Sequence, residues 1–316
     1  MSRKRVDAVV IGRNEGARLV ACLASLRGKV GRIVYVDSGS TDDSVAVATA
    51  AGAEVVMLDM DQPFTAARAR NAGLDRLQDA EFVQLLDGDC TIQPGWISDA
   101  SAYLSTRPGL AVVCGRRREI APEASVYNRL IDREWDTPVG SAKACGGDAL
   151  MRMSALREVG GYDATLIAGE EPDLCLRLRA AGWGIWRLDG EMTLHDAGLT
   201  RFRQWWRRAR RAGHAFAEGA ARHGGGPERH WVDETFRALL WGAALPVVIV
   251  LGSLICPLAL LGTLIYPAQV LRLARKSRDW QWAFFNVLGK FPEAQGALGY
   301  YLQRLRGRKQ GLIEYK

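Results

Sequence analysis

The sequence predicts an α/β fold with a mostly parallel central sheet, followed by a helical, membrane-associated C-terminal region. Over the first 115 residues, short β-branched runs alternate with helical patterns, which is typical of parallel sheets covered by helices on both faces. Two acidic signatures lie within residues 1–200, and a long stretch without charged residues, 238–271, follows them. These three observations predict a ligand-binding head and a membrane-associated tail.

The expected strands are short apolar runs, and helical patterns separate them. Strands are predicted at 6–11, 33–37, 54–58, 82–87 and 110–114, and helices at 16–26, 41–51, 65–77, 95–104 and 171–181. Ser40 and Thr65 are suited to begin the second and third helices. Ligands of such sheets bind outside the carboxyl ends of the strands. The residues expected in one crevice are therefore those that follow or end strands: Arg13, Asn14, Glu15, Asp37 and Asp87.

Charge divides the chain into two parts with different partners. Residues 1–200 carry 23 Lys and Arg against 28 Asp and Glu, whereas residues 201–316 carry 19 against 7. The six cysteines form no CxxC pair and have no regular spacing, so the sequence implies neither a zinc site nor a disulfide framework. Reduced thiols in the cytosol are the simpler interpretation. The N-terminus lacks the apolar run of a signal peptide, so we expect the head to stay in the cytosol.

The first acidic signature, Asp87-Gly88-Asp89, follows an apolar strand. Asp-Gly pairs also occur in ordinary turns. Two uncompensated carboxylates at one strand end would repel each other unless a cation joins them. The sequence therefore favours a divalent metal site at Asp87 and Asp89, which would hold a diphosphate.

The second signature, Glu170-Glu171, opens a helix-like stretch, where acids also suit the helix dipole. A carboxylate at this place can remove a proton from an incoming hydroxyl. His195 lies downstream of both signatures and is a candidate metal ligand, although lone histidines are more often structural. Asp37 could cap a helix or bind a base or ribose. Because Asp87-Gly88-Asp89 and Arg70-Asn71 lie in the same half of the chain, the binding role is favoured. Residues 116–118, three consecutive arginines, are expected to be solvated, with contact to a phosphate as the less favoured alternative.

The apolar stretch 238–271 is longer than one membrane span and is interrupted by Pro246, Pro257 and Pro267. We expect two short membrane helices or a re-entrant hairpin turning near residues 253–257; a buried helical pair in a soluble domain is the alternative. Flanking cations would keep both ends in the cytosol. Basic residues interleaved with Trp at 201–211 suit nucleic acid or a membrane surface, and the nearby apolar stretch decides for the membrane. A second interfacial segment, 280–309, carries Trp280, Trp282 and a cluster of cations that includes Arg304, Arg306, Arg308 and Lys309.

Five motifs occur in a fixed order: Val-Val-Ile-Gly-Arg-Asn-Glu at 9–15, Val-Asp-Ser-Gly-Ser-Thr-Asp at 36–42, Ala-Arg-Asn-Ala-Gly at 69–73, Leu-Asp-Gly-Asp at 86–89 and Gly-Glu-Glu-Pro-Asp-Leu at 169–174. Together they resemble the family 2 inverting glycosyltransferases with the GT-A fold, over about residues 6–200. The resemblance implies that Asp37 and Asp87 bind the nucleoside, that Asp89 with His195 holds Mg²⁺ or Mn²⁺, and that Glu171 is the base. It places the donor within the set Arg13, Asn14, Glu15, Asp37, Ser38, Arg70, Asn71, Asp87 and Gly88.

The sequence departs from the family pattern at three places. Glu171 stands where Asp is usual, the first strand ends in a shorter motif, and Gln204-Trp205-Trp206-Arg207-Arg208 lacks the last Trp of processive members. A chain-extending synthase is therefore not expected. A sugar nucleotidyltransferase would need a glycine-rich loop after the first strand, and only Gly12 and Gly16 occur there. A non-catalytic membrane adaptor would tolerate the loss of Asp89 or Glu171, yet both acids are present.

We therefore predict a GT-A-like glycosyltransferase domain at 1–200, a basic and aromatic connector at 201–237, a membrane hairpin at 238–271 and an interfacial tail at 272–316. The expected reaction is metal-dependent transfer of a sugar from a nucleotide-diphosphate sugar to an acceptor hydroxyl. The expected partners are that donor, a lipid-linked or other glycan acceptor of envelope or exopolysaccharide synthesis, and membrane lipids, but no nucleic acid. The expected location is the cytoplasmic face of the plasma (inner) membrane.

Overall fold

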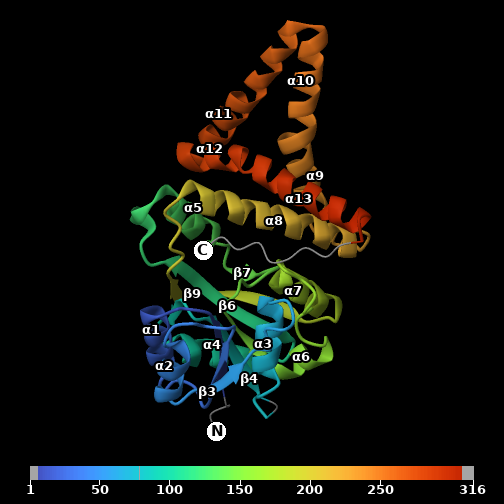
Figure 1. Ribbon diagram of the computed structural model, residues 1–316. Helices are drawn as coiled ribbons and strands as arrows, with labels where there is room; N and C mark the ends of the chain where they lie inside the picture. Colours follow the sequence, from blue (N-terminus) through green and yellow to red (C-terminus); the bar gives the residue numbers. More distant parts are fainter. Residues whose placement is uncertain (1–5, 78, 308–316) are drawn as a thin grey trace. The chain divides into compact units, whose positions relative to one another are not determined.

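A computed structural model describes residues 6–77 and 79–307 and divides the chain into two compact units, Met1–Gly198 and Leu199–Lys316 (Figure 1). The first unit is built around one mixed sheet, and the second is helical. Two residues of the predicted basic tail, Arg308 and Lys309, lie outside the described residues.

The N-terminal half of the sheet is parallel. β1 (Val6–Gly12) lies between β2 (Ile33–Asp37) and β4 (Phe82–Asp87), and β3 (Glu54–Met57) flanks β2. Buried Val, Ile and Leu side chains run along β1 and β4, as expected for strands covered on both faces. These four strands confirm the predicted parallel arrangement.

The other half of the sheet contains antiparallel pairs. Among the described residues the strand order is β3-β2-β1-β4-β8-β6-β9-β5, with β7 paired to β9. The added strands are β5 (Cys90–Ile92), β6 (Leu110–Glu119), β7 (Gly140–Ser141), β8 (Ala149–Arg152) and β9 (Gly184–His195). β8 is antiparallel to both β4 and β6, whereas β6 and β9 are parallel. The GT-A-like α/β class is confirmed, and its sheet is mixed beyond β4.

Helices pack against this sheet, and apolar side chains of both form the hydrophobic core. They are α1 (Ala17–Leu26), α2 (Ser44–Ala50), α3 (Ala66–Leu74), α4 (Trp96–Ser105), the 3₁₀ turn η1 (Pro122–Ala124), α5 (Val126–Glu134), α6 (Met153–Glu158) and α7 (Glu170–Ala180). α3 packs on β1 and β2, and α4 packs on β6. Thr65 caps α3 as predicted, because its side chain accepts a hydrogen bond from the Arg68 amide at 3.1 Å. The second helix begins at Ser44 rather than residue 41, because residues 38–43 form the loop that follows β2.

Strand β6 is longer than the sequence pattern predicted. The expected strand ended at Cys114, but pairing with β9 continues to Glu119. Arg116 and Arg117 therefore lie in the sheet. The expectation that all three arginines are solvated is wrong for these two: Arg116 is buried and forms an ion pair with Asp132 at 2.8 Å. Arg118 alone is exposed, and it pairs with Glu191 at 2.6 Å.

The second unit contains two long helices, α8 (Phe202–His223) and α13 (Lys290–Leu305), packed against each other. Glycines allow this close approach: Gly213 faces the backbone of Glu293, and Gly296 faces the backbone of Arg210. Trp206 Nε1 donates to Gln295 Oε1 at 3.1 Å across the same contact. The short helix α12 (Trp280–Leu288) precedes α13.

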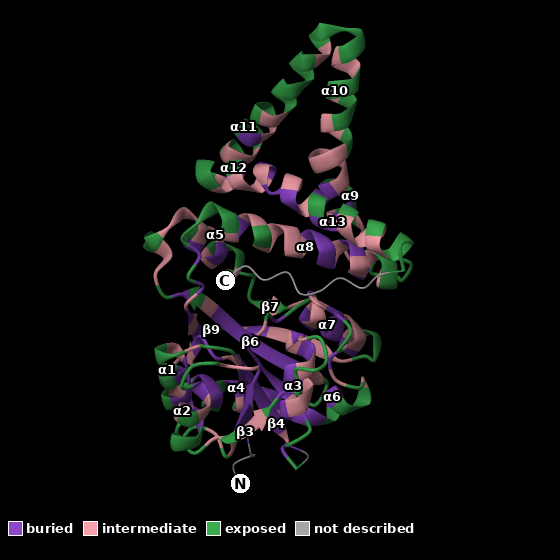
Figure 2. Cartoon of the chain, viewed as in Figure 1, coloured by how far each residue is buried: buried purple, intermediate pink, exposed green. Residues whose placement is uncertain are grey.

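The apolar stretch forms a helical hairpin within the second unit. One arm, Val232–Ile255, comprises α9 (Val232–Leu239), the π-helical turn η2 (Leu240–Ala244) and α10 (Leu245–Ile255). The other, Pro257–Ser277, comprises η3 (Pro257–Leu264) and α11 (Ile265–Ser277). Both arms are long and apolar enough to cross a membrane, and only 6% of the 18-residue apolar segment of each arm is buried. Figure 2 shows both arms as mostly exposed or intermediate residues. A buried core of a soluble domain does not match this exposure.

Candidate active site

The carboxyl ends of β1, β2 and β4 lie side by side and form the floor of the candidate site. Gly12 pairs with Asp37, and Ile11 pairs with Asp87, so the three ends are level. The Gly88 amide donates to the Ile11 carbonyl at 2.8 Å. A Cβ at Gly88 would lie 3.2 Å from that oxygen, so glycine permits the two turns to approach each other.

The Asp37 carboxylate is fully buried and holds the turn after β2. Its Oδ1 accepts from the Tyr35 hydroxyl at 3.0 Å, and its Oδ2 accepts from the Gly39 and Ser40 amides at 3.0 and 2.8 Å. Both oxygens are thus engaged within the protein. The neighbouring Ser38 hydroxyl is buried and has no hydrogen-bond partner among the described residues. In this geometry Asp37 positions the turn, and Ser38 retains hydrogen-bonding capacity.

The loop after β1 is joined to the loop after β2 through Asn14. This residue has a left-handed backbone (φ 56°); its amide donates to Ser40 Oγ at 2.9 Å, and its Oδ1 accepts from the Thr41 amide at 2.7 Å. Glu15 pairs with Arg18 at 2.8 Å. Arg13 is exposed at the rim of the loop. Asn14 therefore fixes the loops that surround the strand ends.

Asp87 is neutralised by two buried arginines. Arg70 Nη2 lies 2.9 Å from Asp87 Oδ1, and Arg117 Nη2 lies 3.5 Å from Asp87 Oδ2. The other nitrogen of Arg70, Nη1, lies 2.8 Å from Glu170 Oε1. Burial by itself lowers the pKa of Arg70, but the nearby carboxylates raise it by more than that. The pKa is therefore higher than usual, and the guanidinium stays charged. One arginine thus joins the two acidic signatures, and Asp87 forms ion pairs with two guanidinium groups.

Arg117 and Asp148 were not identified from the sequence. Arg117 Nε lies 3.3 Å from Asp148 Oδ2, and its guanidinium lies 4.6 Å above the ring of Trp135. Asp148 is fully buried and also accepts from the Thr193 hydroxyl at 3.0 Å. Burial raises the pKa of Asp148, and Arg117 opposes that rise. No local motif marks Asp148, because its partners come from β6 and β9.

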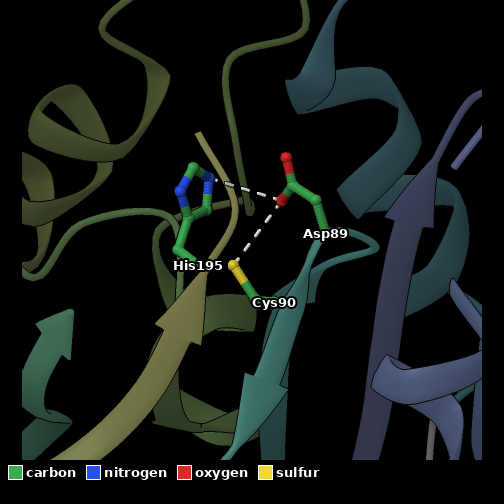
Figure 3. Close-up of side chains that lie close together, drawn as sticks. All are labelled: Asp89, Cys90 and His195. Atoms are coloured by element: carbon green, nitrogen blue, oxygen red, sulfur yellow. Dashed lines mark hydrogen bonds and ion pairs between the residues drawn. The ribbon is translucent and has the colours of Figure 1, made fainter. Parts of the chain in front are cut away.

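Asp89, Cys90 and His195 converge from the adjacent strands β5 and β9 (Figure 3). His195 Nε2 lies 3.4 Å from Asp89 Oδ1, and both side chains are buried. Glu119 Oε2 lies 3.7 Å from the other imidazole nitrogen, Nδ1. A carboxylate behind a metal-binding imidazole is a common outer-shell arrangement. A carboxylate oxygen with an imidazole nitrogen is a donor set that fits Mn²⁺, and Mg²⁺ through the oxygen.

The two acids that begin α7 have different surroundings. Glu170 faces Arg70, whereas Glu171 Oε1 accepts from the Cys145 amide at 2.6 Å and from the Cys175 thiol at 2.9 Å. Glu171 is buried, with 7% of its surface exposed, and burial raises the pKa of its carboxyl group. A carboxylate with a raised pKa is suited to accept a proton near neutral pH.

Asn71 contacts the backbone of a neighbouring loop. Its Nδ2 donates to the Tyr162 carbonyl at 2.8 Å, and its Oδ1 accepts from the Tyr162 amide at 2.9 Å. These contacts fix the segment that leads to α7.

Gly147 lies close to the ion pair between Asp87 and Arg70, since a Cβ there would lie 2.9 Å from Asp87 Oδ2.

The aromatic residues of the second unit differ in exposure. Trp205 is buried and packs edge-on against Phe285 at a centroid distance of 5.0 Å. Trp280 is 59% exposed, and Phe202 and Phe284 are each 46% exposed. Trp280, Phe202 and Phe284 are therefore exposed enough for the predicted contact with the membrane surface, whereas Trp205 is not.

The sequence is similar to those of known glycosyltransferases. Residues 7–160 match the model of glycosyl transferase family 2. The pre-mycofactocin glycosyltransferase of Mycobacterium tuberculosis is 29% identical over 305 residues, which cover 91% of this chain and 61% of the relative. The chain thus spans about three fifths of that relative's length. The succinoglycan biosynthesis protein ExoA of Rhizobium meliloti is 23% identical over 192 residues, 56% of this chain and 58% of the relative.

Solved structures share the fold. The mannosyltransferase PcManGT from Pyrobaculum calidifontis, in complex with GDP-Man and Mn²⁺, superposes with a TM-score of 0.66 at 21% identity, covering 94% of this chain and 88% of that one. Glucosyl-3-phosphoglycerate synthase from Mycobacterium tuberculosis, with Mn²⁺ and uridine-diphosphate, gives a TM-score of 0.51 at 20% identity, covering 70% and 80%. These likenesses show the GT-A fold.

Proposed function

Since this chain belongs to glycosyl transferase family 2, we propose that it transfers a sugar from a nucleoside-diphosphate sugar to an acceptor hydroxyl, with inversion at the anomeric carbon. The observation that carries this proposal is the Arg70 bridge, which joins Asp87 to Glu170 at 2.9 and 2.8 Å. It brings the donor-side acid next to the acid-rich start of α7.

The donor side is assigned to the strand ends. Asp89 and His195 would hold Mg²⁺ or Mn²⁺, which stabilises the departing diphosphate. Asp87, fixed between Arg70 and Arg117, would contact the nucleoside. Asp37 and Asn14 would position the loops that surround it, with the Ser38 hydroxyl as a hydrogen-bonding group. The relatives' structures with GDP-Man and with uridine-diphosphate support a nucleotide ligand of this class.

Glu171 is assigned as the base that removes the acceptor proton. Its raised pKa keeps proton affinity high, and the Cys145 amide holds its Oε1 in place at 2.6 Å. Glu170 is engaged by Arg70 and would help to hold that guanidinium against Asp87. The attacking oxygen would displace the diphosphate in line, which gives inversion.

We assign a lipid-linked glycan as the acceptor and the cytoplasmic face of the membrane as the location. The support is the exposed hairpin: Leu254 and Ile255 are 79% and 91% exposed at its apex. The relative named for succinoglycan biosynthesis agrees with a polysaccharide acceptor. A second candidate acceptor is of the kind named for the mycobacterial relative, because that match covers 91% of this chain.

The test is a donor and acceptor screen with the full-length protein in detergent. A panel of nucleotide sugars with Mg²⁺ or Mn²⁺ should release nucleoside diphosphate from one donor, and lipid-linked glycan should accelerate that release. Acceleration by a pre-mycofactocin acceptor instead would select the second candidate. Release of pyrophosphate from a nucleoside triphosphate and a sugar phosphate would indicate a nucleotidyltransferase and overturn the proposal.

A further inference from the structure

Two cysteines surround the carboxylate of Glu171, and the transfer reaction assigns them no role. Cys145 lies in the segment between β7 and β8, whereas Cys175 lies one turn after Glu171 on α7. Their sulfur atoms are 3.6 Å apart, and Cys175 Sγ lies 2.9 Å from Glu171 Oε1. All three side chains are buried, and one ligand atom from each lies within 4.8 Å of the others. Cys145 and Cys175 are separated by 30 positions in the sequence, so only the fold brings them together.

The spacing of the two sulfurs matches a thiolate metal site. With Zn–S bonds of about 2.3 Å and tetrahedral geometry, two zinc-bound thiolates lie about 3.8 Å apart. The observed separation of 3.6 Å needs little adjustment. The carboxylate supplies a third ligand, which leaves one tetrahedral position for water.

We propose that Cys145, Cys175 and Glu171 form a binding site for a thiophilic divalent cation of the Zn²⁺ class, and that its occupation inhibits sugar transfer. Binding displaces the two thiol protons to solvent and engages the Glu171 carboxylate. The inhibitory part rests on the proposed role of Glu171 as the base. Soft thiolates favour Zn²⁺ over Mg²⁺ and Mn²⁺, so the ions assigned to the Asp89–His195 site would not fill this site.

The binding test uses the reduced full-length protein with Cys256→Ser, because Cys256 is exposed and would bind metal by itself. Titration with Cd²⁺ should produce the ultraviolet charge-transfer band of a two-thiolate site, and Zn²⁺ should abolish it. Cys145→Ser and Cys175→Ser should each weaken binding more than about tenfold, since even outer-shell partners change metal affinity by about 10–100-fold. Cys145→Ser keeps the contact to Glu171 that the backbone amide makes.

Two buried cysteines provide matched controls. Cys90 belongs to the Asp89–Cys90–His195 group, and Cys114 lies in the same core but outside both groups. Cys90→Ser and Cys114→Ser should both retain the band. A band that survives in Cys145→Ser and Cys175→Ser, or disappears in Cys90→Ser, would overturn the site. X-ray absorption of the Zn²⁺-loaded protein tests it without substitutions: two sulfur ligands are expected, and none would refute it.

The inhibition test measures turnover at saturating Mg²⁺ or Mn²⁺ while Zn²⁺ is added. Turnover should fall and should recover when a chelator removes Zn²⁺ and Mg²⁺ or Mn²⁺ is restored. In Cys145→Ser, the Zn²⁺ concentration for half inhibition should rise more than about tenfold, as the affinity does. Binding with two sulfur ligands but no inhibition would overturn the inhibitory part and the assignment of Glu171 as base. Absence of any turnover without Zn²⁺ would instead count against the proposed function.

Discussion

At the scale of single residues, neighbouring acids of the same type acquire different chemistry from their contacts. Glu170 is paired with a buried guanidinium, whereas Glu171 is surrounded by an amide and two thiols. The first environment stabilises a fixed negative charge. The second raises proton affinity by burial, and two predictions about Glu171 follow from this difference.

Glu171→Gln removes the base and retains the size and the acceptor oxygen for the Cys145 amide. Positioned bases contribute about 10²–10⁴-fold, so turnover should fall by that range while donor affinity is retained. Steady-state rates and donor titration measure the two effects. Glu123→Gln, at an exposed position, is the control and should retain activity. Wild-type turnover in Glu171→Gln would exclude it as the base.

The pH dependence follows from the same group. Burial raises the pKa of Glu171, so kcat/KM should fall with decreasing pH at values above the usual pKa of a glutamate. Between the pKa of Glu171 in the unfolded chain and its higher pKa in the native state, the native carboxyl group is still protonated while the unfolded one is not. The free energy of unfolding therefore decreases as pH rises through this range. Thermal unfolding of wild type and Glu171→Gln should therefore diverge, the variant becoming relatively more stable as pH rises. Parallel curves would contradict a raised pKa.

Asp89→Asn should remove metal-dependent donor binding. The substitution leaves His195 Nε2 facing a neutral amide, which is a weaker ligand for a hard cation than a carboxylate. Isothermal titration of donor with and without Mn²⁺ measures the effect. Asp99→Asn changes an exposed acid on α4 and should bind donor as the wild type does. Full activity of the wild type in excess chelator would refute the metal requirement.

At the scale of elements, the site depends on loops held close to strand ends. The segment before β8 approaches the β4 end so closely that a Cβ at Gly147 would lie 2.9 Å from Asp87 Oδ2 and 3.1 Å from Arg70 Nη2. The fixed orientation of Asp87 is thus a property of three elements together: β4, α3 and this segment.

Gly147→Ala should displace Asp87 or Arg70 and weaken donor binding. A charged hydrogen bond contributes about 1.5–3 kcal/mol, so affinity should fall roughly 10–100-fold. Donor titration measures this loss, and thermal unfolding checks that the fold persists. Gly190→Ala is the matched control, because a Cβ there meets nothing within 4 Å. Equal affinities in the two variants would show that Asp87 does not need this fixed position.

At the scale of the whole molecule, the apolar hairpin is the feature on which the proposed membrane location depends. Between Pro246 and Gly262, the polar side chains are limited to Ser253, apart from the weakly polar Cys256. The Ser253 hydroxyl donates to the Val250 carbonyl at 2.7 Å, and the Cys256 amide donates to Gly252 at 2.8 Å. An apex with paired polar groups suits the bilayer interior better than the aqueous side. We therefore expect a re-entrant hairpin, whose apex stays within the bilayer.

Arginines at Leu254 and Leu258 should release the protein from membranes. Each Arg near the bilayer centre costs about 2.5–3.5 kcal/mol on insertion scales. Fractionation of the full-length variant after alkaline extraction measures retention, with Val20→Arg, an exposed apolar position on α1, as control. Retention of the double variant would indicate that the apex reaches water on the far side. A wild type that is soluble without detergent would refute the anchor.

Local pattern determined the ends of β2 and β4, the two acidic signatures and the uncharged stretch, because each depends on residues adjacent in the sequence. Strand β6 exceeded its predicted length, because its last residues are held by pairing with β9 rather than by apolar character. Prediction of the elements therefore succeeded where hydrophobic periodicity alone fixes them.

The identity of each site contact was decided by the tertiary structure. The sequence could not show that Arg70 and Arg117 neutralise Asp87, that Asp37 is buried by its own turn, or that Asp148 lies beneath the site. It implied no zinc site, yet the fold places the sulfur atoms of Cys145 and Cys175 next to each other and close to the Glu171 carboxylate. A side chain's charge and proton affinity depend on which distant residues exclude water from it, and packing alone determines that.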